Sequence, residues 1–166
     1  MKRRLRIGLL SVAIIGVASP SLPARDSGTR ITYGPYSIEW PAKPSLAYQS
    51  PGQGGAAFET LALTLAPITF TFSYLRFQSP QMTVGARDFA RNMTNGHADA
   101  QILDASNGQL KGSSVANAVY RIGDTTTIAY SVQPTLFLNY VFTVAGPDSP
   151  ALRAHAQDFS ESFQKN

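Results

Sequence analysis

The sequence predicts an α+β domain in which an antiparallel sheet of about six or seven strands packs against two helices. Three observations predict this class. Several runs alternate apolar and polar residues, which is the period of a strand with one buried face. Two other segments repeat apolar residues every three or four positions, the period of a helix with one buried side. A composition of 43% hydrophobic and 14% charged residues indicates a chain that can form a core.

The first residues have the order of a secretory leader. Four basic residues precede an uncharged run over 7–18, and small residues and prolines follow it. The run is shorter than the ~20 residues that a membrane-crossing helix needs. We therefore expect a signal peptide over 1–24, removed between Ala24 and Arg25, and a flexible N-terminus over 25–32. The basic residues of the leader are Lys2, Arg3, Arg4 and Arg6.

Three alternatives for the leader stay open. It could remain attached as an N-terminal anchor, be cleaved after Ser19, or use the twin-arginine route through Arg3 and Arg4. The expected outcome is a periplasmic or secreted protein of a Gram-negative bacterium, with no stable membrane anchor after cleavage.

The charge and the cysteine content of the chain exclude several classes of function. Four of the 14 basic residues lie in the leader, so the remainder carries as many basic as acidic residues, 10 of each. A nucleic-acid partner is not expected, because such binding needs a basic surplus. The chain has no cysteine, which excludes disulfides, thiolate metal sites and cysteine catalysis.

In the N-terminal half, the spacing of apolar residues and the positions of turn residues predict the strands and loops. Residues 36–40 alternate as a strand that Pro41 ends, and 50–57 form a loop. Two more strands, 58–66 and 68–77, form a hairpin around Pro67. The second of them directs one set of side chains to the core: Ile68, Phe70, Phe72 and Tyr74.

A helix is expected next, followed by four strands. Ser79 and Pro80 suit a helix start, and Asn95-Gly96 suits its end. Its apolar stripe is Met82, Ala86, Phe89, Ala90 and Met93. Turns at Asn107-Gly108, Gly123-Asp124 and Pro134 separate the strands. These strands are 99–105, about 110–122, 126–132 and 138–144.

The chain ends in a second amphipathic helix. Its stripe is Leu152, Ala156, Phe159 and Phe163. Both helices must bury their stripes, and the apolar face of the sheet is the available surface.

In this order, three segments resemble the PsbP-like superfamily and the Mog-type proteins that share its α/β/α sandwich. They are 36–44 (YSIEWPAKP), the helix at 86–89 (ARDF) and the ending 158–163 (DFSESF). The resemblance implies a single PsbP-like domain over 33–164, a PsbP-like α/β/α sandwich, and export. It implies no activity, and the photosystem and Ran-binding roles of named members do not transfer. The sequence departs from many members at 112–114, where they carry a glycine-rich turn.

No catalytic, cofactor-binding or metal-binding site stands out. His97, Asp99 and His155 are too few for a metal site, which needs three or four converging ligands. Ser113 and Ser114 lack a nucleophile elbow. We expect no cofactor and no metal.

Two further candidates have simpler interpretations. Glu39 and Glu59 are expected to be outward-facing solubility residues rather than a carboxylate pair. The glycines of 52–55 precede a strand instead of a helix, so they form a loop rather than a phosphate site.

Aromatic residues give the one hint of a binding surface. Tyr33, Tyr48 and Phe137 fall outside the alternating inward sets, and exposed aromatics mark interaction sites. We therefore expect a non-enzymatic exported domain that binds a protein partner or has an accessory role in the envelope. The alternatives are a carrier of a small apolar ligand or lipid, and an enzyme with an unrecognised site. The sequence indicates no particular oligomeric state.

Overall fold

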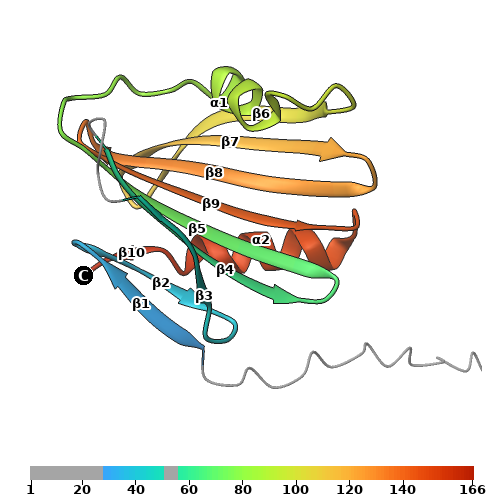
Figure 1. Cartoon of the computed structure of the whole chain (residues 1–166), viewed down its shortest axis with the longest axis horizontal. Coiled ribbons are helices and arrows are strands. Elements are labelled where there is room, and N and C mark those ends of the chain that lie inside the picture. Colours follow the sequence, from blue (N-terminus) through green and yellow to red (C-terminus); the bar gives the residue numbers. More distant parts are fainter. Residues whose placement is uncertain (1–27, 51–55) are drawn as a thin grey trace, which may run out of the picture.

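The computed structural model describes residues 28–50 and 56–166 (Figure 1). These residues form two antiparallel sheets and two helices, α1 (Ala86–Thr94) and α2 (Pro150–Glu161). None of the helices in this part of the chain is long and apolar enough to cross a membrane. The predicted leader and its cleavage site between Ala24 and Arg25 lie outside the described residues.

The larger sheet has seven strands in the order β3-β4-β5-β9-β8-β7-β6. Neighbours in sequence pair as hairpins, except that β5 and β9 pair across the helix α1 and three intervening strands. Its strands are β3 (Ser45–Ser50), β4 (Ala56–Leu65), β5 (Ile68–Phe77), β6 (Gln101–Leu110), β7 (Ser113–Ile122), β8 (Thr125–Thr135) and β9 (Leu138–Gly146).

The smaller sheet has the order β1-β2-β10 and lies beside α2 (Figure 1). Its strands are β1 (Thr29–Tyr33), β2 (Tyr36–Trp40) and β10 (Gln164–Lys165). Residues 164–166 thus return to the β1–β2 hairpin, where the Asn166 N–H donates to the Pro35 carbonyl at 2.9 Å.

The predicted α+β class, with one sheet of about six or seven strands, was wrong. The structure is dominated by strands, and they divide into two sheets. Alternation in 36–40 correctly indicates a strand, but it says nothing about which sheet that strand joins. Three strands were missed because their sequences show no clear alternation with one buried face: β1 begins inside the segment 25–32, β3 is exposed along nearly its whole length, and β10 has only two residues.

One face of the large sheet carries the main core. The small sheet and α2 pack on this face, and aromatic rings fill the space between the layers. Trp40 and Phe159 meet at a ring-centroid distance of 5.1 Å, and Phe163 stacks on Tyr36 at 5.1 Å. The side chains with almost no exposure include Trp40, Tyr140, Phe70, Phe72, Phe142 and Phe163.

The opposite face carries a second core under α1. Phe89 and Ala90 of the helix pack on Ala116, Ala118 and Ala129 of β7 and β8. The two helices therefore cover different faces, and α1 covers only the part of its face formed by β6, β7 and β8 (Figure 1). Within residues 28–50 and 56–166, no helix lies over the part formed by β3, β4, β5 and β9.

The helix α1 begins at Ala86, seven residues after the predicted start at Ser79. The preceding segment is held extended by the β8–β9 hairpin: the Gln81 N–H donates to the Leu136 carbonyl at 2.7 Å, and Gln133 Nε2 donates to the Gln81 carbonyl at 3.1 Å. Met82 consequently lies outside the helix and is exposed.

Asn107-Gly108 was wrongly predicted as a turn. Both residues lie within β6, and the reversal occurs at Lys111-Gly112, where both residues have positive φ. Asn107 has another use, because its Oδ1 accepts the Ala86 N–H at 2.9 Å and so caps α1 from the neighbouring strand.

Candidate interaction surface

The three aromatic residues predicted to be exposed have different surroundings. Tyr33 is half-buried between the sheets, where its ring lies 5.1 Å from Phe72. Its hydroxyl donates to Glu59 Oε1 at 2.9 Å. Tyr33 therefore belongs to the packing between the two sheets, whereas Tyr48 and Phe137 are exposed.

Tyr48 lies on the edge strand β3 with 55% of its surface exposed. It pairs with Thr60, which directs it to the sheet face that α1 partly covers. Its ring contacts that of Phe58 at a centroid distance of 5.4 Å, and Phe58 lies directly opposite Leu75 on β5. An apolar row therefore crosses three strands.

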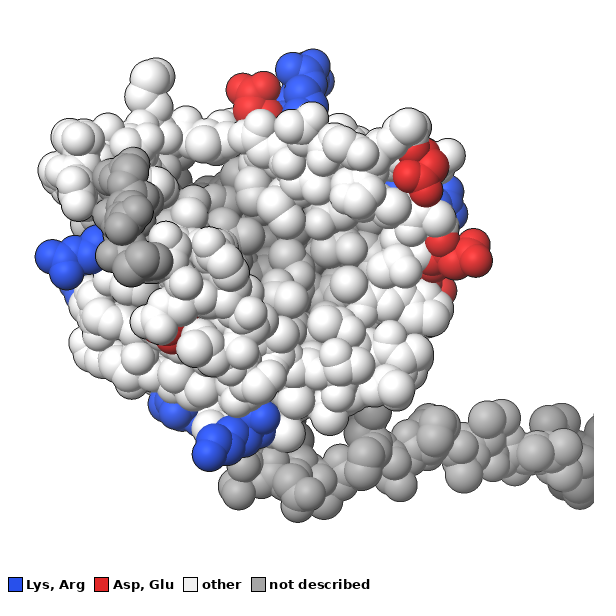
Figure 2. All heavy atoms as spheres, viewed as in Figure 1, with Lys and Arg blue, Asp and Glu red and all other residues white. Residues whose placement is uncertain are grey.

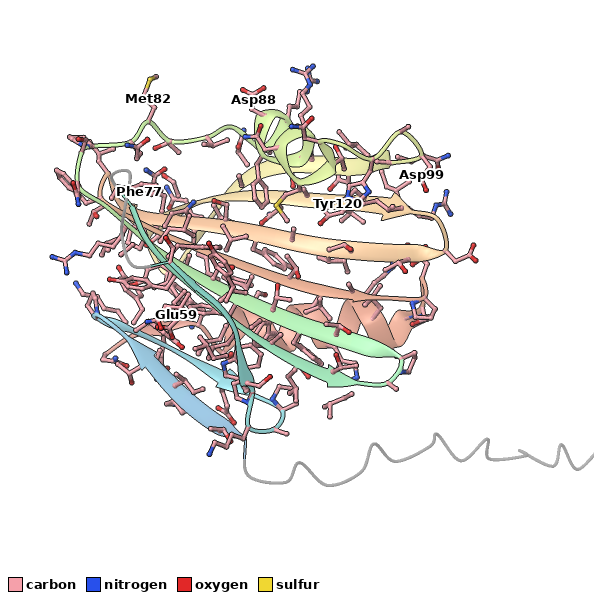
Figure 3. All side chains as sticks on the ribbon, in the orientation of Figure 1. Glu59, Phe77, Met82, Asp88, Asp99 and Tyr120 are labelled. Carbon is pink, nitrogen blue, oxygen red and sulfur yellow. The ribbon has the colours of Figure 1, made fainter. Side chains whose placement is uncertain are left out.

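Phe137 lies at the tip of the β8–β9 hairpin, next to the end of β5. Its carbonyl accepts the Phe77 N–H at 2.9 Å. Leu136, its neighbour in the tip, is 50% exposed and Phe137 is 45% exposed. Figure 3 shows Phe77 and Met82 at this same end of the sheet.

These residues lie on neighbouring segments at one end of the large sheet. Cross-strand pairing links Tyr48 to β5, and backbone hydrogen bonds link β5 and the segment at Gln81 to the hairpin tip. We call this region the sheet-end surface, and its members are Tyr48, Phe58, Leu75, Phe77, Met82, Leu136 and Phe137.

Beside the sheet-end surface, the uncovered face is polar but uncharged. Hydroxyls pair across the strands, with Thr60 to Ser73 at 2.9 Å and Thr71 to Thr143 at 2.7 Å. Figure 2 shows this face white in its middle, with charged side chains around its rim. Interface centres are depleted of charge, so this distribution suits contact with another surface.

The other candidate residues are accounted for by local contacts. Glu39 forms an ion pair with Arg30 at 3.0 Å, and Glu59 accepts from Tyr33. Asp99 Oδ2 accepts the Gly123 N–H at 3.1 Å, while the His155 ring meets Phe70 edge-on at 5.8 Å. Glycines 52–55 lie outside the described residues.

Neither the two histidines nor the two serines join a larger site. His97 is exposed after α1, whereas His155 lies on α2 on the other face of the sheet. Ser113 is buried and Ser114 is exposed at the start of β7. In the two ranges that the structure covers, no three residues of the His, Cys, Asp and Glu types come together as metal ligands.

Burial is the main cause of the pKa shifts in the molecule. It raises the pKa of Tyr120, Tyr130, Tyr33 and Tyr140 above the usual phenol value. For Tyr33, the hydrogen bond to Glu59 and the charge of Glu59 raise the pKa further. All four phenols are therefore protonated at neutral pH.

Sequence reasoning found Tyr48 and Phe137 but missed the residues between them. The missed residues on the predicted strands are Phe58, Leu75 and Phe77. The alternation of apolar and polar residues does not indicate whether a helix covers this end of the sheet face. Met82 was assigned to the buried stripe of a helix. The available signal was Pro80, which is as compatible with an extended segment as with a helix start.

Comparison with known proteins gives matches in structure only. No protein-family model and no curated protein sequence matches the chain. The solution structure of cyanobacterial PsbP (CyanoP) from Synechocystis sp. PCC 6803 superimposes with a TM-score of 0.62 at 13% identity, covering 95% of this chain and 99% of that one. The immunity protein TplEi of the T6SS from Pseudomonas aeruginosa, complexed with "L" peptide, gives a TM-score of 0.46 at 13% identity, covering 89% and 56%.

Proposed function

We propose that this chain, whose fold is PsbP-like, is an exported, non-catalytic accessory protein that acts by binding a protein partner. The observation that carries the proposal is the sheet-end surface, which gathers exposed and half-buried aromatic and aliphatic side chains at one end of the sheet. Soluble proteins rarely leave such side chains contiguous unless another surface covers them.

The sheet-end surface has the composition of an interface centre. Aromatic residues and methionine are enriched in such centres, and charged residues are depleted. Burying one exposed Phe or Leu side chain contributes about 1.5–3 kcal/mol before the costs of association. Burial of Phe137 and Leu136 at the hairpin tip would therefore contribute favourably to binding.

The packing favours binding over the two alternatives. An enzyme needs acid and base groups tuned toward neutral pH, whereas the groups with shifted pKa values are tyrosines that burial keeps protonated. A lipid carrier needs an apolar cavity, whereas the space between the large sheet and α2 is filled by Phe142, Phe159 and Phe163.

Export is the second part of the proposal and rests on the leader. Cell fractionation followed by N-terminal sequencing of the protein from its own host tests it. The expected result is protein outside the cytoplasm that begins at Arg25. Recovery of cytoplasmic protein that begins at Met1 would contradict export without affecting the binding proposal.

Affinity capture from the envelope of the host tests the binding proposal. The wild type is compared with a double variant, Tyr48→Ser with Phe137→Ser, and with Leu65→Ser as a matched control. Leu65 is 44% exposed at the β4–β5 turn, which is the opposite end of these strands. We expect one partner to be recovered with the wild type and the control but lost with the double variant. Recovery with all three, or with none, would contradict the proposal.

A further inference from the structure

A recess on the far edge of the large sheet has the features of a second binding site. It lies between α1 and the edge strand β6 and has a volume of about 390 Å³. Helix α1 provides one wall, and the first residues of β6 provide the other. The lining residues are Arg87, Arg91, Ile102, Leu103, Asp104 and Ala105.

The strand beside this recess has a free edge. In the sheet order β6 is the last strand, so its outer N–H and C=O groups have no strand partner within the described chain. Its side chains are exposed along nearly the whole length, and Asp104 is its single charged residue. Edge strands of this kind, without lysine or proline, accept an added strand from another chain.

A bulge limits where a strand could be added. The pairing of β6 with β7 shifts between Ile102 and Asp104, which makes Leu103 an extra residue on β6. The regular edge therefore runs from Asp104 to Leu110. An added antiparallel strand would begin beside Leu110 and reach its carboxyl end at the bulge, which is where the recess lies.

The charges of the recess suit a single carboxylate. Arg91 is close to Asp88 at 3.4 Å, and both side chains are at least 70% exposed. Arg87, one turn away, forms no hydrogen bond or ion pair among residues 28–50 and 56–166. Asp104 in the lining would repel a run of acidic side chains, but the two guanidinium groups can bind one terminal carboxylate.

The recess also offers apolar surface next to these cations. Ile102 and Leu103 are each 45% exposed and lie in the lining. A bound segment that ends in an apolar residue would cover them and place its carboxylate toward α1.

We propose that the groove between α1 and β6 binds the C-terminal end of an extended peptide. The peptide adds to β6 as an antiparallel strand, its last apolar side chain covers Ile102 and Leu103, and Arg87 and Arg91 bind its free carboxylate. This site lies at the opposite edge of the sheet from Tyr48, so its test does not depend on the sheet-end surface.

Fluorescence anisotropy with the full-length chain tests the proposal. The probe is a short fluorescein-labelled peptide of alternating threonine and valine that ends in leucine with a free carboxylate. The same peptide with a C-terminal amide is its matched control. We expect the free acid to bind about tenfold more tightly than the amide, because the charge-assisted hydrogen bonds need the carboxylate.

Two variants connect the effect to the groove. Combining Arg87→Ala with Arg91→Ala should reduce binding of the free acid to that of the amide. Arg153→Ala should change nothing, because Arg153 pairs with Asp148 at the start of α2 on the other face. Hydrogen exchange should slow at 105–110 when the free acid binds.

Three results would overturn this assignment. They are equal affinities for acid and amide, an equal loss in the Arg153 variant, and no binding of either peptide up to about 1 mM.

Discussion

The side chain of Asn107 caps the start of α1 from the neighbouring strand. The residue before the helix is Gly85, which offers no side-chain oxygen, and the Ala86 N–H is satisfied by Asn107 Oδ1 from β6. The cap is thus supplied by tertiary structure rather than by the local sequence. This contact also holds the start of the helix against the edge strand that borders the proposed peptide groove.

Removing this cap should destabilise the protein. We expect Asn107→Ala to lower the free energy of unfolding by about 1 kcal/mol and to speed hydrogen exchange in the first turn of α1, because one helix N–H loses its acceptor. Asn107→Asp keeps an acceptor and should retain most of the stability. Urea denaturation and hydrogen exchange measure both effects, and equal stability of the alanine variant and the wild type would contradict this role.

Buried tyrosines make stability depend on alkaline pH. The Tyr140 hydroxyl donates to the Tyr33 carbonyl at 3.0 Å, and burial, followed by the neighbouring Tyr74 and Tyr36, raises the Tyr140 pKa in the folded protein. The unfolded phenol ionises near pH 10. The stability from this group is therefore fully present below about pH 10 and is lost as the pH rises further.

Tyr140→Phe tests this dependence. The variant should be less stable than the wild type at pH 7, because the Tyr33 carbonyl loses its donor, and the difference should shrink above about pH 10. Urea denaturation at several pH values measures the difference in free energy of unfolding between the wild type and the variant. A gap that stays constant up to about pH 12 would show that Tyr140 does not titrate with the unfolded chain.

At the scale of elements, α1 depends on small residues in the strands beneath it. Ala116, Ala118 and Ala129 are almost fully buried and leave room for the Phe89 ring. Larger residues at these positions would push the helix away from the sheet. Helix α2, in contrast, packs on large aromatic residues.

Enlarging this alanine surface should weaken the attachment of α1. We expect Ala118→Leu to cost about 1–3 kcal/mol through overpacking and to increase hydrogen exchange across α1. Ala154→Leu, on the exposed side of α2, is the matched control and should have little effect. Denaturant unfolding compares them, and similar stabilities would show that the space under α1 adapts freely.

The sequence predicts those elements whose period is set by one buried face. The hairpin of β4 and β5 and the helix α2 have this property, and alternation or a helical stripe correctly indicates each of them. The periodicity of apolar residues does not predict the structure where tertiary contacts set the backbone conformation. Hydrogen bonds to the β8–β9 hairpin hold Gln81 extended, and Asn107 caps a helix in place of forming a turn.

The candidate site was only partly predictable for the same reason. Tyr48 and Phe137 stand out because they break the inward pattern. Phe58 and Leu75 follow a strand pattern, so their exposure depends on the absence of a helix above them, which is a property of the whole fold.

At the scale of the whole molecule, the aromatic core joins the two sheets. Phe163 has no exposed surface, and its ring contacts Tyr36 of the small sheet and Tyr140 and Phe142 of the large one. It immediately precedes β10, which pairs with β2. One side chain therefore fixes both the end of the chain and the position of the small sheet.

Truncating this residue should affect both sheets. We expect Phe163→Ala to lower the free energy of unfolding by about 3–5 kcal/mol, because it leaves a cavity between the layers. Gln164→Ala, at the exposed neighbouring position, should have little effect. A loss below about 1 kcal/mol in calorimetry or urea denaturation would contradict this role of the ring.

The large sheet leaves different parts of its two faces open, since each helix covers only some of the strands (Figure 1). The sheet-end surface results from this arrangement, because neither α1 nor α2 lies over β4 and β5 on the α1 side. Binding through that surface requires Phe137 to be in contact with a partner in the cell.

Photo-crosslinking in living host cells measures this contact most directly. A photoreactive phenylalanine analogue replaces Phe137 in one variant and Leu65 in the other, and the products are identified by mass spectrometry. Binding at the sheet-end surface predicts a discrete crosslinked protein from position 137 and none from position 65. The claim would be contradicted by no product from position 137, or by the same products from both positions.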